Sequence, residues 1–205
     1  MGAVMAIGRP GQPATADNWM FPPGDGWTFD QVKELELPWD WELVDGAIVV
    51  RGQTKLWHDI VRDNLHRQLQ LAAPSPYGVN VERCVMLTED NVRKPDVVVY
   101  DTTNLDIFTA ECTPASEVKL AVEVVSPGSR SDDRFRKPAL FAEANVPCYW
   151  RIELEQDRRL AVHEFWLPVG EQSYIPAPLH PVHREKLVTD LPFSLEIDLT
   201  ALLKL

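Results

Sequence analysis

The sequence contains few cysteines and no CxxC motif. Its three cysteines are Cys84, Cys112 and Cys148. Because this number is odd and no metal-binding spacing occurs, we expect neither a disulfide framework nor a zinc site. Unpaired cysteines are typical of a reducing compartment, so the pattern predicts a cytoplasmic setting.

Long apolar runs and the common catalytic motifs are also absent. No run approaches the ~18 residues of a membrane-spanning helix, and the first residues, MGAVMAIGRPGQP, lack the features of a signal peptide. We therefore predict no membrane partner. The absence of GxGxxG, a Walker loop and a nucleophile elbow excludes the enzyme classes that those motifs define.

The chain has no excess of positive charge. Its formal net charge is −11, which repels nucleic acid at long range. This charge argues against a nonspecific DNA-binding protein. It argues less against a metal-dependent nuclease, because bound cations neutralise the acidic centre of such an enzyme.

Hydrophobic periodicity indicates one α/β (α+β) domain. With 205 residues and 45% hydrophobic composition, the chain is long enough for one sizeable core. Residues 1–26 are rich in Pro, Gly and Ala and predict a flexible N-terminal leader, so the domain would span 27–205. The expected elements are short helices near 28–37 and 132–144, a long helix over 57–73, hairpins over 41–50 and 148–167, and strands over 79–87, 96–101 and 119–126.

Two carboxylates interrupt the most apolar strands of this pattern. Asp96 opens KPDVVVYD, and Glu123 lies within KLAVEVVS. A buried carboxylate is costly unless a cation meets it. If the two strands are neighbours, both carboxylates can bind one Mg²⁺, with the carbonyl of Val124 as a further ligand. Lys137 would then orient the attacking water or stabilise charge on the phosphate. The alternative is a structural ion pair of strand-edge charges.

The order of these segments is similar to the Uma-type family of endonucleases. It resembles that family in WELVDGAIVV, a helix opening at His58, RKPDVVVYD, LAVEVVSPGSRSDDRFRK and NVPCYWRIE, which together cover roughly residues 28–200. The family belongs to the restriction-endonuclease-like PD-(D/E)xK superfamily. The resemblance implies a mixed β-sheet flanked by helices, with Asp96 as the motif aspartate and Glu123 as the second metal carboxylate.

The sequence departs from the superfamily motif at one position. Val125 stands where the ExK pattern has its lysine. The family pattern has this lysine later, on the following helix, where the sequence has Lys137. Pro138 follows at once and predicts either a helix that starts near Lys137 or a kink there.

Glu42 and His58 are secondary candidates for the catalytic site. Glu42 matches a recurring glutamate of the family, but a solvent-facing charge in a hairpin is the alternative. His58 would contact a phosphate or act as a base near neutral pH, and an exposed or capping histidine is its alternative.

Three functions are compatible with the sequence. The first is an endonuclease that hydrolyses DNA with Mg²⁺ (or Mn²⁺), and cleavage of both strands would suit a homodimer. The second is a catalytically inactive nuclease-fold protein that binds or regulates, which the missing ExK lysine and the acidic charge favour. The third is a metal-dependent hydrolase for a small phosphorylated substrate.

Overall fold

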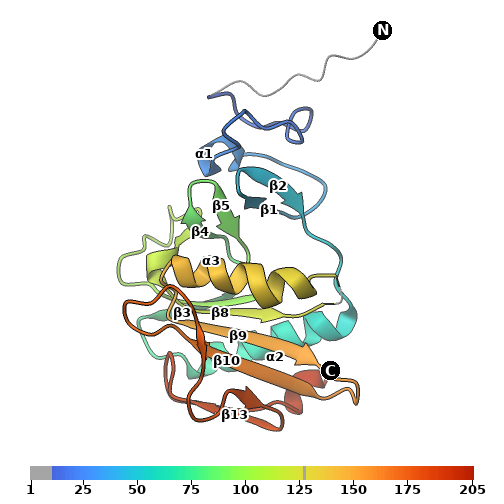
Figure 1. The fold of residues 1–205 in the computed structure, drawn as a ribbon, viewed down its shortest axis with the longest axis vertical. Coiled ribbons are helices and arrows are strands. Elements are labelled where there is room, and N and C mark those ends of the chain that lie inside the picture. Colours follow the sequence, from blue (N-terminus) through green and yellow to red (C-terminus); the bar gives the residue numbers. More distant parts are fainter. Residues whose placement is uncertain (1–10, 127) are drawn as a thin grey trace. The chain divides into compact units, whose positions relative to one another are not determined.

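The chain forms two compact units in a computed structural model that describes residues 11–126 and 128–205 (Figure 1). Unit 1 comprises the residues up to Gln53 together with Met86–Lys94, and unit 2 comprises Thr54–Val85 and Pro95–Leu205. No helix among the described residues is both long and apolar enough to cross a membrane.

Unit 1 contains the predicted N-terminal helix and hairpin. Thr28 and Gln31 form the capping box at the start of α1 (Phe29–Val32). The hairpin joins β1 (Trp41–Val44) to β2 (Ala47–Val50) through Asp45 and Gly46, which have φ angles of 49° and 71°. These positive φ angles are those of the two-residue turn that an Asp-Gly pair favours. The sheet continues from β1 to β5 (Asn91–Arg93) and to β4 (Val85–Thr88), which enters unit 1 at Met86.

The predicted leader is described only from residue 11 onward, and its residues 1–10 lie outside the described part. The amide of Ala14 donates a hydrogen bond to the carbonyl of Gln31 (2.8 Å). The indole of buried Trp27 donates to the carbonyl of Trp19 (3.0 Å). The leader boundary at residue 26 stays a prediction.

Unit 2 is built on a mixed sheet of the order β11-β10-β9-β8-β6-β3. Strand β8 runs parallel to β9, and its other neighbour β6 is antiparallel to it. The mixed sheet and the α+β class are therefore as predicted. The elements are α2 (Leu56–Ala72), β3 (Tyr77–Val81), β6 (Val97–Asp101), β7 (Thr113–Pro114), η1 (Ala115–Glu117), β8 (Val118–Val124), η2 (Asp132–Arg136), α3 (Lys137–Glu143), β9 (Cys148–Leu154), β10 (Leu160–Trp166), β11 (Ile175–Pro176), β12 (Val182–His183), β13 (Lys186–Thr189), β14 (Leu195–Asp198) and η3 (Ala201–Leu203).

Alternation along the central strands separates two faces of this sheet. Leu120, Val122 and Val124 of β8 lie in the main core with the apolar face of α2. The intervening residues Ala121 and Glu123 face the opposite side, because successive side chains of a strand alternate. Helix α3 covers that opposite side, so α2 and α3 lie on different faces of the sheet (Figure 1). The carboxylate of Glu123 therefore lies beneath α3.

The single strand predicted over 79–87 is wrong. Strand β3 ends at Val81, and β4 begins at Val85 in a different sheet. Glu82 has a φ angle of 48°, which extended backbone does not allow, so the chain turns between the two apolar runs. Alternation alone does not reveal such a break.

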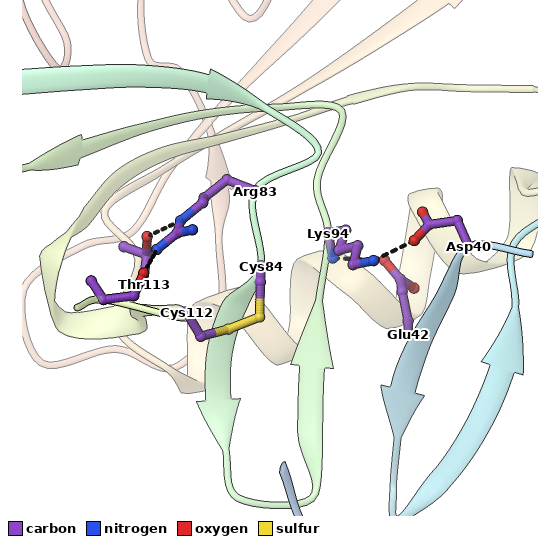
Figure 2. Close-up of a disulfide and its surroundings, with 8 residues drawn as sticks. Asp40, Glu42, Arg83, Cys84, Lys94, Cys112 and Thr113 are labelled. Carbon is purple, nitrogen blue, oxygen red and sulfur yellow. Dashed lines mark hydrogen bonds and ion pairs between the residues drawn. A yellow bond between two sulfur atoms is a disulfide. The ribbon is translucent and has the colours of Figure 1, made fainter. Parts of the chain in front are cut away.

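The expectation of unpaired cysteines is also wrong. Cys84 and Cys112 form a disulfide with their Cα atoms 4.9 Å apart, and Cys148 is free and buried (Figure 2). The two cysteines are 28 residues apart in sequence. They meet because the amide of Thr113 donates to the carbonyl of Cys84 (2.8 Å), a backbone pairing that the cysteine spacing does not signal.

Candidate active site

Asp96 and Glu123 approach each other across the β6–β8 pair. Val97 pairs with Val122, and Val98 pairs with Ala121. The next position outward brings Asp96 opposite Glu123, on the same face of the sheet. Their exposed fractions are 3% and 1%. The predicted adjacency of the two strands is therefore observed, and the two carboxylates lie together in an interior environment.

Asp96 contacts the backbone of β8 and the imidazole of His58. Its Oδ2 atom accepts a hydrogen bond from the amide of Val124 (2.7 Å) and lies 3.2 Å from Nε2 of His58. Burial raises the pKa of Asp96, but the hydrogen bond and charge of His58 and the charge of Lys137 outweigh it and lower the pKa. Asp96 is therefore ionised at neutral pH.

His58 lies in the first turn of α2 and is buried rather than exposed. Burial lowers its pKa, whereas the hydrogen bond and charge of Asp96, with a smaller contribution from Asp59, raise it and prevail. The Nδ1 atom of His58 lies 3.4 Å from Oδ1 of Asp59. The imidazole is thus fixed between two carboxylates, with one of them in the candidate site.

Lys137 lies between two buried carboxylates. Its Nζ atom is 2.8 Å from Oε2 of Glu123 and 2.9 Å from Oδ1 of Asp133. Burial raises the pKa of Asp133, although the charge of Lys137 opposes this shift. The hydroxyl of Tyr149 donates to the Asp133 carbonyl (2.7 Å) and so anchors this part of the helix to β9.

The backbone around Pro138 shows how Lys137 reaches the sheet. The segment Asp132–Arg136 is a π-helical turn, and α3 begins at Lys137 with Pro138 in its first turn. Helical backbone already runs through Arg130 and Ser131 before this turn, and the amide of Lys137 donates to the carbonyl of Asp132, so Pro138 directly follows the π-helical turn. A single wide turn of this kind is frequent at functional sites. The element α3 begins at Lys137, which was one of the two predicted alternatives, but helical backbone precedes it from Arg130; the side chain of Lys137 reaches Glu123.

Glu42 lies in unit 1 and contacts residues of that unit. Its carboxylate accepts hydrogen bonds from Nη1 of Arg93 (3.1 Å) and from the amide of Lys94 (2.8 Å). The Lys94 side chain pairs with Asp40 (Figure 2). Glu42 is buried, so the solvent-facing alternative for this residue is wrong.

Asp133 is the residue of this cluster that the sequence analysis missed. It was masked by its position in a run of alternating charges, RSDDRFRK. The available signal was its spacing of four residues from Lys137, which brings two helical side chains together.

The donor set fits a divalent cation of the magnesium type. Mg²⁺ is commonly held by one or two carboxylates together with water and substrate phosphate, and Asp96 and Glu123 supply two carboxylates. Within residues 11–126 and 128–205, no group of three or more His, Cys, Asp or Glu side chains has the geometry of a metal site. The protein would therefore supply two carboxylate ligands, Asp96 and Glu123, to a divalent cation, and substrate and water would supply the others.

The fold is that of a nuclease-like protein. A solved structure of a "putative nuclease belonging to DUF820" from Anabaena variabilis matches with a TM-score of 0.64 and 14% sequence identity, over 86% of this chain and 97% of the other. At this identity the match concerns the fold alone. No curated protein matches the chain.

The family follows from the sequence match. The Uma2 family, described as "putative restriction endonuclease", matches residues 28–200. The chain belongs to this family, as the ordered motifs predicted. Family and fold together support a nuclease function.

Proposed function

We propose that this protein is an endonuclease that hydrolyses phosphodiester bonds of DNA with a divalent cation, Mg²⁺ or Mn²⁺. The observation that supports this proposal best is the pair of buried carboxylates, Asp96 and Glu123, that face each other with Lys137 beside them. A purely structural ion pair needs one carboxylate for one lysine, whereas this site gathers three carboxylates around Lys137 and His58.

Asp96 and Glu123 are the proposed metal ligands. The cation, when bound, would polarise the scissile phosphate and lower the pKa of a water molecule. Asp96 is suited to this role because its lowered pKa keeps it ionised. His58 positions the Asp96 carboxylate through the contact of 3.2 Å.

Lys137 is proposed to stabilise negative charge on the phosphate oxygens. Its Nζ atom is within ion-pair distance of Glu123, so an ammonium group lies next to a proposed metal ligand. Asp133 positions this ammonium from the preceding turn of the helix. Glu42 stays a secondary catalytic candidate. The cytoplasmic setting also stays a prediction, although the Cys84–Cys112 disulfide removes the support that unpaired cysteines gave it.

The test is nicking of a supercoiled plasmid with Mg²⁺ or with EDTA. Wild type should nick the plasmid only with the metal, and Glu123→Gln should lower the rate by at least about 100-fold. Lys137→Ala should retain metal binding and lose activity. Equal activity of Lys137→Ala and wild type would remove Lys137 from the mechanism. No cleavage by the wild type under any metal condition would favour the inactive binding module instead.

A further inference from the structure

A loop of unit 2 displays two large apolar side chains to solvent. We call residues 102–112 the Phe108 loop; its tip is formed by Ile107 and Phe108, whose exposed fractions are 73% and 91%. Adjacent exposed side chains of this size are typical of interaction surfaces. The exposed apolar tip therefore indicates that this loop is a binding surface for a partner molecule.

The Phe108 loop is held in a fixed shape. The Asp106 carboxylate accepts hydrogen bonds from the amide of Phe108 (3.0 Å) and from the hydroxyl of Thr109 (2.9 Å). At the base, Nη2 of Arg83 donates to the carbonyl of Ala110 (2.7 Å), and the disulfide fixes Cys112 (Figure 2). A preorganised loop loses little conformational entropy on binding, so the exposed tip is suited to docking.

The acidic residues near the tip indicate which charge the partner surface carries. Residues 102–112 contain Asp106 and Glu111 and no lysine or arginine, and Glu117 follows the loop. This loop would repel a nucleic acid. A partner surface complementary to this loop would be apolar at its centre and basic at its rim.

The same chain has such a surface on the helical segment before α3. We call Arg130, Phe135 and Arg136 the Phe135 patch; all three side chains are exposed, and Phe135 is 73% exposed. The half-buried Asp132 lies on the same turn and offsets part of the charge. Arg134 pairs with Glu153 of β9, and this contact holds the turn that presents Phe135.

The loop and the patch lie at opposite ends of the central strands. Tyr100, at the end of β6, pairs with Val118, where β8 begins, so the Phe108 loop starts at that end of the sheet. The Phe135 patch follows the other end of β8, after Val124. Strand β8 has seven residues, which corresponds to a separation of about 20 Å. Figure 1 shows the start of the α3 segment and the β6–β7 connection at opposite ends of the sheet.

We propose that a second copy of this chain covers these surfaces, with the Phe108 loop of each protomer docked on the Phe135 patch of the other. Two copies related by a twofold axis perpendicular to β8 run antiparallel, which brings opposite ends of the two molecules together. In each of the two contacts, the acidic Phe108 loop faces the basic residues of the Phe135 patch. Because the dimer is symmetric, both contacts are made together. The dimer would suit cleavage of both DNA strands, but the interface does not rest on the proposed nuclease function.

The test is the molar mass of the full-length protein by light scattering and sedimentation, without DNA or metal. The wild type should be a concentration-dependent dimer. Phe108→Asp should raise the dimer dissociation constant by about 30-fold, as expected for loss of an interface hot spot. Val169→Asp is the matched control, because Val169 is also fully exposed (104%) and lies outside both surfaces. Its mass should equal that of the wild type.

A complementary pair of variants tests the partner assignment. Phe108→Lys and Phe135→Glu should each be monomeric alone, and their mixture should regain a heterodimer with one new ion pair and one unaltered contact. A monomeric wild type, equal effects of Phe108→Asp and Val169→Asp, or a mixture that stays monomeric would overturn the proposal. Because the readout is mass alone, these results are separate from any failure of plasmid cleavage.

Discussion

Replacing Lys137 by methionine removes the ammonium group that lies between two buried carboxylates. Glu123 and Asp133 are each about 1% exposed, and their oxygens lie 2.8 and 2.9 Å from Nζ of Lys137. Methionine retains most of the side-chain volume, so the change chiefly deletes the charge. Breaking a buried ion pair by removal of one partner costs about 3–5 kcal/mol, because the remaining charge is uncompensated.

This loss is large enough to measure by urea unfolding in EDTA at neutral pH. For a protein of this size it corresponds to a decrease in Tm of about 6–20 °C. The double variant Lys137→Met/Glu123→Gln should recover part of the stability, because the uncompensated carboxylate becomes a neutral amide. Mg²⁺ should stabilise Lys137→Met more than it stabilises the wild type, since the cation replaces the missing charge.

The pH dependence provides a second readout of the same variant. Burial already raises the pKa of Asp133, and without the charge of Lys137, which opposes this shift, the pKa of Asp133 should rise further. A carboxyl group with a raised pKa destabilises the fold as the pH rises. The deficit of Lys137→Met should therefore shrink at acidic pH. A deficit below about 1 kcal/mol at neutral pH, or a double variant no more stable than Lys137→Met, would refute the reasoning.

Three further predictions concern the scaffold. Cys112→Ser should lower the unfolding free energy by up to about 3.6 kcal/mol in urea, the value for opening a loop of 28 residues. Glu164→Gln should make the unfolding free energy fall less steeply as the pH is lowered into the acidic range. Burial raises the pKa of Glu164, but hydrogen bonds from His183 and other donors lower it below the unfolded value, so its stabilisation is lost as the pH falls. Gly46→Ala should lower the Tm, because φ is +71° and the new Cβ would lie 2.7 Å from the Gly26 Cα atom.

Each scaffold prediction has a contradicting outcome. An unchanged urea midpoint for Cys112→Ser would show that the disulfide adds nothing to the backbone pairing. A fall in the unfolding free energy of Glu164→Gln toward acidic pH that coincides with that of the wild type would mean that another carboxyl group controls it. A Tm of Gly46→Ala equal to that of the wild type would contradict the close approach in unit 1.

The sequence predicted those parts of the fold that depend on local chemistry. The Asp45–Gly46 turn, the capping box at Thr28 and the long amphipathic helix follow from turn residues and periodicity, and all are present. A shared site at Asp96 and Glu123 requires that their strands be neighbours, and the register of β6 and β8 shows that they are. Local patterns determine such elements because neighbouring residues supply their stabilising contacts.

The features that the sequence did not reveal depend on long-range contacts. The Cys84–Cys112 disulfide forms because distant segments pair, and no spacing rule signals it. The positive φ angle of Glu82 divides an apolar alternation that is otherwise typical of one strand. Asp133 joins the site through the helix that positions Lys137, and its charge alone resembled an exposed surface.

Direct metal binding tests the central claim, that Asp96 and Glu123 together hold a divalent cation. Titration with Mn²⁺, followed by the loss of the free-ion signal in electron paramagnetic resonance, should show saturable binding to the wild type. Asp96→Asn and Glu123→Gln should each weaken it by about tenfold or more, whereas Glu164→Gln, a buried carboxylate outside the site, should not. Absence of binding to the wild type, or equal binding by all three variants, would contradict the account.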